Sequence, residues 1–102
     1  MNGKTNNEKT TMPITPENLP KHELIGLHTE VIESSNEDYI GLSGEVINET
    51  KNTLNIEGKT VEKKICRFLF KIPEGEKVEL DGGLINKRPE ERVKMKLPSK
   101  WS

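Results

Sequence analysis

The chain has a single cysteine, few aromatic side chains and no long apolar run. Cys66 is the only cysteine among 102 residues, so no disulfide forms within the chain. With His22 and His28 it supplies too few ligands, at the wrong spacing, for a zinc site. We interpret Cys66 as a core residue and both histidines as surface residues.

No stretch approaches the roughly 18 apolar residues of a membrane helix. The N-terminus is polar and lacks the apolar centre of a signal peptide. These two absences predict a soluble, intracellular protein.

Motifs for self-contained catalysis are also missing. Ser43 is not part of a Gly-x-Ser-x-Gly elbow, and no Gly-rich phosphate loop precedes a helix. A nucleophile needs a base and an orienting acid nearby, and the two aspartates, Asp38 and Asp81, are a small supply. The sequence predicts that this chain does not catalyse a reaction alone.

Length and composition allow one small domain. Apolar residues make up 30% and aromatic residues 4% of the chain, so the core must be small. The polar N-terminus predicts a disordered tail over residues 1–16, and we place the folded domain at 17–96 and a C-terminal tail at 97–102.

Alternating apolar residues predict five or six short strands. Gly41 and Gly44 lie inside one of them, where glycine indicates a sharp bend or a close backbone approach. We expect strands from Leu27 to Ile32, Tyr39 to Ile47, Thr53 to Glu57, Thr60 to Ile72 and Lys77 to Leu80, with Leu84–Ile85 as a sixth short strand or the end of the sheet.

Helical signals flank these strands. Pro20 suits a helix start and Gly26 a helix stop, and Arg88 to Met95 carries Pro89 and two acids in a first turn. Short strands with close turns and a helix at each end predict an all-β fold, a small antiparallel barrel that removes exposed sheet edges.

Charge is unevenly distributed along the chain. The first 50 residues hold three Lys/Arg and nine Asp/Glu, whereas residues 51–102 hold 13 and 8. A basic face of this kind favours contact with phosphates of RNA, mainly through backbone and shape because exposed aromatic residues are scarce. The candidate RNA-contacting residues are Lys51, Lys63, Lys64, Arg67, Lys71, Lys87, Arg88 and Arg92. The alternative is an ordinary solvated charged surface.

A second set of residues is a candidate protein-binding surface. Apolar side chains of the two expected helices form it: Leu19, Leu24, Ile25, Val93 and Met95. The alternative is that they cover an end of the barrel.

Several segments resemble the archaeal ribonuclease P protein component 1 family, whose eukaryotic relatives are shared by ribonuclease P and ribonuclease MRP. The similar segments run in order from Leu19 to Lys94. They are His22-Glu-Leu-Ile-Gly-Leu27, Gly41-Leu-Ser-Gly-Glu-Val-Ile-Asn-Glu-Thr-Lys-Asn-Thr-Leu54, the strand from Lys63 to Phe70, and Asp81-Gly-Gly-Leu-Ile-Asn-Lys-Arg-Pro-Glu-Glu-Arg92.

The resemblance implies an Sm-like barrel and a noncatalytic role in the cytoplasmic ribonucleoprotein that removes the 5′ leader of precursor tRNA. It implies that the RNA holds the catalytic Mg²⁺ ions and that no cofactor is bound by this chain. It also implies a zinc-ribbon protein partner that contacts the terminal segments and an edge of the barrel. Two other functions stay open: an Sm-like RNA chaperone that forms homo-oligomeric rings, and a protein-interaction adaptor without RNA contact.

Overall fold

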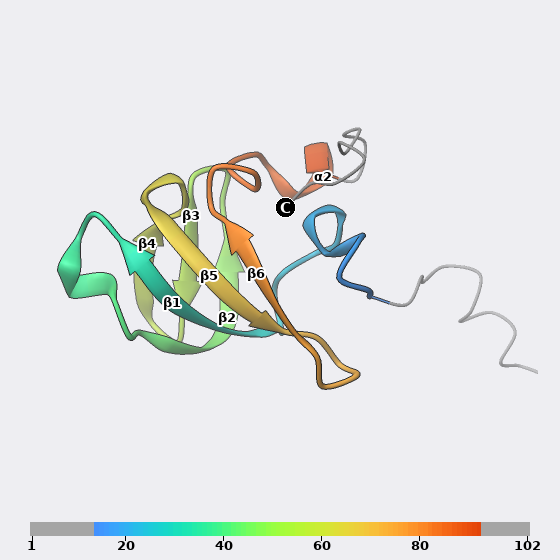
Figure 1. Cartoon of the computed structure of the whole chain (residues 1–102). Coiled ribbons are helices and arrows are strands. Elements are labelled where there is room, and N and C mark those ends of the chain that lie inside the picture. Colours follow the sequence, from blue (N-terminus) through green and yellow to red (C-terminus); the bar gives the residue numbers. More distant parts are fainter. Residues whose placement is uncertain (1–13, 93–102) are drawn as a thin grey trace, which may run out of the picture.

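The computed structural model describes residues 14–92. It is all-β, with six antiparallel strands in one sheet of order β4-β3-β2-β1-β5-β6 (Figure 1). The strands are β1 (His28–Ser34), β2 (Ser43–Glu49), β3 (Thr53–Ile56), β4 (Lys59–Glu62), β5 (Cys66–Lys71) and β6 (Lys77–Asp81).

Helical segments are short. Between residues 14 and 92, three 3-10 turns accompany the helix α2 (Pro89–Arg92): η1 (Leu19–Lys21), η2 (Glu37–Tyr39) and η3 (Lys63–Ile65). Figure 1 shows α2 and η1 beside each other at one end of the sheet, and Arg92 hydrogen-bonds to the η1 backbone. Within residues 14–92 no helix is long and apolar enough to cross a membrane.

The predicted strand from Thr60 to Ile72 is wrong in one respect, because η3 divides it into β4 and β5. These two strands are four positions apart in the sheet order. In a flat sheet they would be separated by about 19 Å, whereas the step from Glu62 to Cys66 spans at most about 14 Å. The sheet must therefore curl, as Figure 1 shows.

Strand β2 carries much of this curvature. Its first residues pair with β1 and its last residues pair with β3. Gly44 has a φ of +149°, and a Cβ there would meet the Glu57 side chain at 2.6 Å. The expected close approach is confirmed at Gly44.

The closed barrel is not confirmed. β4 and β6 are the two edges of an open sheet, and within the described part of the chain no ladder joins them. The predicted strand at Leu84–Ile85 is a turn. The predicted strand from Tyr39 begins only at Ser43, because Tyr39 belongs to η2, so Gly41 lies before β2 and not inside it. The expected tails, and the C-terminal helix beyond Arg92, lie largely outside the described residues.

One apolar core fills the inside of the curl. Alternate residues of the strands point into it, and each large side chain that is fully buried contributes about 1.5–3 kcal/mol. Its members include Val31, Val46, Leu54, Ile56, Val61, Cys66, Phe68, Phe70, Val78, Leu80 and Ile85. Leu19 and Leu24 close the end nearest η1.

Candidate nucleic-acid interface

The Lys63 ammonium is enclosed by oxygen atoms. Its Nζ donates to Glu49 Oε2 at 2.7 Å, and the Lys63 side chain is fully buried. The same nitrogen lies within 3.2 Å of four backbone carbonyl oxygens, those of Thr50, Lys51, Ile85 and Lys87. We call these five oxygens the Lys63 cage. It joins the β2–β3 turn to the segment that follows β6.

Arg92 shares the same carboxylate. Its Nη2 donates to both Glu49 oxygens at 2.8 Å. Its Nη1 donates to the carbonyls of Pro20 at 3.0 Å and His22 at 2.9 Å. Arg92 therefore fastens α2 to the η1 segment, and Glu49 connects this junction to the Lys63 cage.

The cluster holds two cations and one carboxylate away from water. Burial lowers the pKa of Lys63, and the hydrogen bond and charge of Glu49 oppose that shift. Burial also lowers the pKa of Arg92, again against the attraction of Glu49. Glu49 is thus the group that makes the burial of both cations tolerable.

Glu49 faces inward because of a β-bulge. The register between β2 and β3 shifts between Val46 and Asn48, so Val46 and Glu49 are both buried although they are three residues apart. Strict alternation along β2 would have placed Glu49 outside. Sequence reasoning therefore missed its role, and the only signal was its place in a segment that resembles a known family.

Two predicted RNA contacts are corrected by this cluster. Lys63 and Arg92 are 0% exposed, and both are occupied by internal acceptors. Periodicity along one continuous strand had placed Lys63 outside, but η3 interrupts that strand. In this fold neither side chain is available to a phosphate.

Four other predicted contacts come together around the cage. Lys51 and Lys87 are exposed, while their carbonyls bind the Lys63 ammonium. Lys64 and Arg88 follow Lys63 and Lys87 in the chain and are exposed as well. We call Lys51, Lys64, Lys87 and Arg88 the cationic rim.

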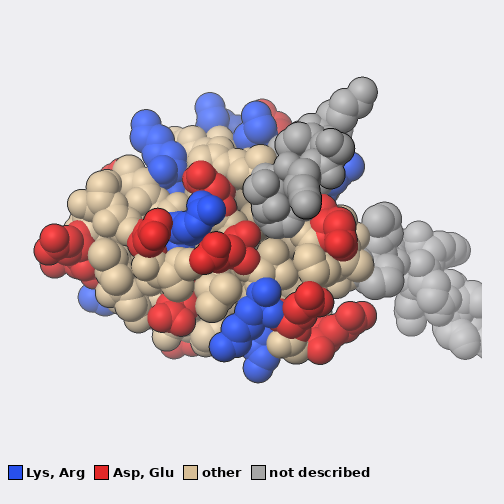
Figure 2. Space-filling view, in the orientation of Figure 1, with Lys and Arg blue, Asp and Glu red and all other residues tan. Residues whose placement is uncertain are grey.

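The cationic rim lies at one margin of the molecule. Figure 2 shows basic side chains along its upper margin, where Figure 1 places the β2–β3 turn and the segment after β6. Within residues 14–92 no carboxylate lies within 4.0 Å of a rim cation. Unpaired surface cations of this kind suit phosphate groups.

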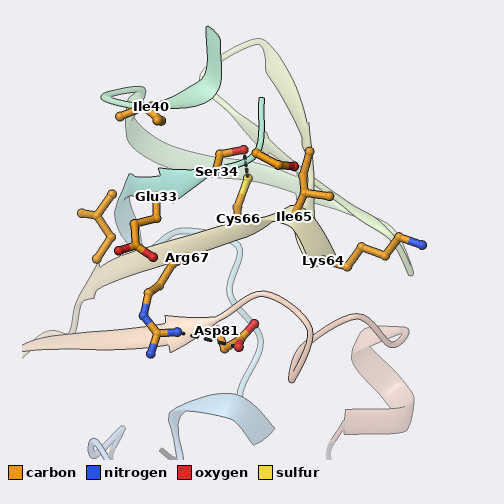
Figure 3. Close-up of a pocket in the computed structure, with 10 residues that line it drawn as sticks. Glu33, Ser34, Ile40, Lys64, Ile65, Cys66, Arg67 and Asp81 are labelled. Atoms are coloured by element: carbon orange, nitrogen blue, oxygen red, sulfur yellow. Dashed lines mark hydrogen bonds and ion pairs between the residues drawn. The ribbon is translucent and has the colours of Figure 1, made fainter. Parts of the chain in front are cut away.

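Arg67 occupies a different environment. Its guanidinium lies 3.6 Å from Glu79 and 3.7 Å from Asp81, and its side chain is 39% exposed. Figure 3 shows it directed toward Asp81 in an open groove of about 420 Å³, which Lys64, Glu33 and Ile40 also line. Glu79 and Asp81 already pair with Arg67, and Glu33 adds a further negative charge, so the groove is less suited to a polyanion than the rim.

Lys71 lies away from the rim, at the opposite end of β5 from η3. It is exposed and stands opposite Lys77 on β6 and His28 on β1. Its predicted RNA contact, like that of Arg67, stays a prediction.

The predicted protein-binding set is also divided. Leu19 and Leu24 are 0% exposed in the core, so the alternative in which they cover one end of the sheet is correct. Ile25 is 40% exposed. Val93 and Met95 lie outside the described residues. Among residues 14–92 no three His, Cys, Asp or Glu side chains gather to hold a metal ion.

The chain is similar to known proteins over most of its length. The family model described as Ribonuclease P/MRP, subunit p29 matches residues 17–95. Ribonuclease P protein component 1 of Methanosphaera stadtmanae is 48% identical over 87 residues, 81% of this chain and 94% of that protein. The protein of the same name from Methanothermobacter thermautotrophicus is 50% identical over 88 residues, 81% of this chain and 95% of that one.

A solved structure agrees with these relatives. It is Mth11, described as a homologue of the human RNase P protein Rpp29, and it is 48% identical with a TM-score of 0.54. The match covers 71% of this chain and 99% of that chain. The chain therefore belongs to the ribonuclease P/MRP subunit p29 family.

Proposed function

We propose that this chain is a protein subunit of ribonuclease P and binds the RNA of that enzyme through the cationic rim. The observation that carries the proposal is the rim itself: four exposed cations on three separate segments whose backbones meet at one buried ammonium. Lys and Arg side chains that neutralise phosphates supply most of the affinity of proteins for nucleic acids. Relatives named Ribonuclease P protein component 1 indicate which RNA this is.

The proposed role is noncatalytic, within a ribonucleoprotein endonuclease that removes the 5′ leader of precursor tRNA. The rim consists of cations, which suit phosphates, whereas Mg²⁺ is held by carboxylates and other oxygen ligands. We therefore assign the catalytic Mg²⁺ ions to the RNA. A cytoplasmic location is part of the same proposal.

A zinc-ribbon protein subunit is the proposed protein partner. Its contact surface would be the junction of η1 and α2, where Ile25 is the exposed apolar residue of the predicted set. Val93 and Met95 remain candidates for the same surface. The fold assignment is an Sm-like barrel, which the curl from β4 to β5 supports.

Reconstituted cleavage tests this function. An archaeal ribonuclease P RNA and the zinc-ribbon subunit are mixed with precursor tRNA at low Mg²⁺, and 5′ leader removal is measured with and without this chain. We expect the chain to accelerate removal and K51A/K87A to lose much of that effect. The matched control K59A/K77A removes two exposed lysines outside the rim and should act like the wild type. No acceleration by the wild-type chain would overturn the proposal.

The open sheet favours one alternative, an Sm-like chaperone in a homo-oligomeric ring. Its two edges, β4 and β6, offer unpaired backbone groups that copies of the chain could join. Native mass spectrometry separates the two functions, because a hexamer or heptamer would support the ring and a monomer would support the ribonuclease P subunit.

A further inference from the structure

We infer that Lys63 is a positioning residue for RNA binding: its buried ammonium sets the spacing of the exposed cations Lys51 and Lys87. The inference rests on the proposed function, since it concerns the same rim. It assigns to Lys63 an effect on RNA affinity without any contact between Lys63 and RNA.

The Lys63 nitrogen contacts two segments that are far apart in the chain. Lys63 Nζ lies 3.2 Å from the Lys51 carbonyl and 3.2 Å from the Lys87 carbonyl. The two carbonyl oxygens are therefore no farther apart than the sum of those distances. Because each side chain starts at the same residue as its carbonyl, the cage holds the bases of both lysines near one point.

Among residues 14–92, no other side chain could replace the Lys63 ammonium between these oxygen atoms. Four carbonyl oxygens and one carboxylate converge on it, and their negative ends repel one another without a cation between them. Carbonyl oxygens that lose this donor must find another partner, and away from water none is at hand. The segments would separate to reach water, and the Asn86–Asn52 side-chain hydrogen bond of 3.2 Å would remain as a weaker link.

Lys63→Met is a suitable variant because it leaves the buried charges balanced. In Lys63→Met, Glu49 keeps both hydrogen bonds to Arg92 Nη2, so one buried cation still faces one buried carboxylate. Met has a similar length and shape without the charge, and the Glu49–Arg92 pair that remains leaves no buried charge uncompensated. We expect this variant to fold, with a loosened turn at residues 50–52 and a loosened segment at 85–88.

A double-mutant cycle tests the inference. Affinity for ribonuclease P RNA is measured by filter binding over a salt series, for the wild type, K63M, K51A/K87A and the combined variant. If Lys63 acts through the two lysines, K63M lowers affinity in the wild type and changes nothing further in K51A/K87A. The slope of log affinity against log salt should weaken in K63M by up to about 1.4–1.8, the share of two phosphates.

Val61→Ala is the control for a simple loss of stability. Val61 is 0% exposed and lies on β4, so its truncation weakens the core without touching the cage. It should leave the salt slope unchanged. Should K63M fail to fold, Lys63→Gln, whose amide donates two hydrogen bonds, enters the same cycle.

Two results would overturn the inference while leaving the proposed function intact. One is an unchanged affinity and slope in the folded Lys63 variant, and the other is an equal loss in the wild-type and K51A/K87A backgrounds. Absence of salt-dependent binding by the wild-type chain would overturn the proposed function, and the inference with it.

Discussion

Replacing Glu49 with Gln should strongly destabilise the fold. Among residues 14–92, Glu49 supplies the one carboxylate within 4.0 Å of Lys63 or Arg92. Its removal leaves two cations in the interior, both with fully buried side chains. Removing one partner of a buried ion pair costs about 3–5 kcal/mol, because the other charge loses its compensation.

The expected loss is a large share of the total free energy of unfolding. Small domains unfold with about 5–15 kcal/mol. For a domain of this size each kcal/mol lowers Tm by about 4–8 °C, so a loss of 3 kcal/mol corresponds to at least about 12 °C. Carbonyl acceptors around both cations remain in Glu49→Gln, so we expect the lower end of the range.

Circular dichroism measures this effect by thermal and urea unfolding. In urea the midpoint should fall while the m value stays unchanged. Glu45→Gln is the matched control, since Glu45 is an exposed residue of the same strand and its replacement should change stability by less than about 0.5 kcal/mol. A Glu49→Gln protein whose free energy of unfolding lies within about 0.5 kcal/mol of the wild type, as for an ordinary surface substitution, would refute the buried cluster.

Three further predictions concern groups around the same cluster. Burial lowers the pKa of Lys63 below its ordinary 10.5, so between the lowered pKa and 10.5 the unfolded chain binds more protons than the folded chain. The free energy of unfolding should therefore rise with pH across that window in the wild type and not in K63M. Urea titrations at a series of pH values measure this difference. Gly82→Ala should lower the free energy of unfolding by at least about 1–3 kcal/mol, because a Cβ there would clash with the Lys63 carbonyl oxygen. At exposed Gly83 the nearest atom to a Cβ is at 3.4 Å, so Gly83→Ala is the matched control. Equal free energies of unfolding for the two variants would contradict this. Cys66 is 4% exposed and burial raises the pKa of its thiol, so iodoacetamide should alkylate the folded chain far more slowly than the urea-unfolded chain; equal rates would place the thiol outside the core.

Period-two patterns identified most of the strands correctly. The expected strand from Thr53 to Glu57 is β3, and Lys77 to Leu80 is β6 within one residue. Alternation succeeds there because regular pairing keeps the inside and outside faces in phase. The single-domain, all-β prediction rests on these segments.

The same rule failed where the backbone leaves regular pairing. A bulge turned Glu49 inward, and the η3 turn buried Lys63, although both carry a charge. Arg92 was also expected to be exposed, because it lies one turn after Arg88 in the expected C-terminal helix. The sequence has no local signal for a bulge or for which carboxylate will meet a cation 14 residues away, because those outcomes depend on how the sheet curls.

The candidate interface was only partly predictable for this reason. Lys51, Lys64, Lys87 and Arg88 were in the predicted set and are exposed at one margin. Their grouping, and the separation of Lys71 from them, follow from the curl and from the cage around Lys63. Charge distribution along the sequence favoured RNA as the ligand, and the proposal that it binds at the cationic rim rests on the tertiary structure.

The most direct measurement is the salt dependence of binding to ribonuclease P RNA, compared between the two pairs of lysine variants. For K51A/K87A we predict a slope of log affinity against log salt that is weaker by about 1.4–1.8, the share of two phosphates. For K59A/K77A, which loses the same charge elsewhere, the slope should match the wild type. Equal losses in both pairs, or none in either, would contradict an RNA-binding surface at the cationic rim.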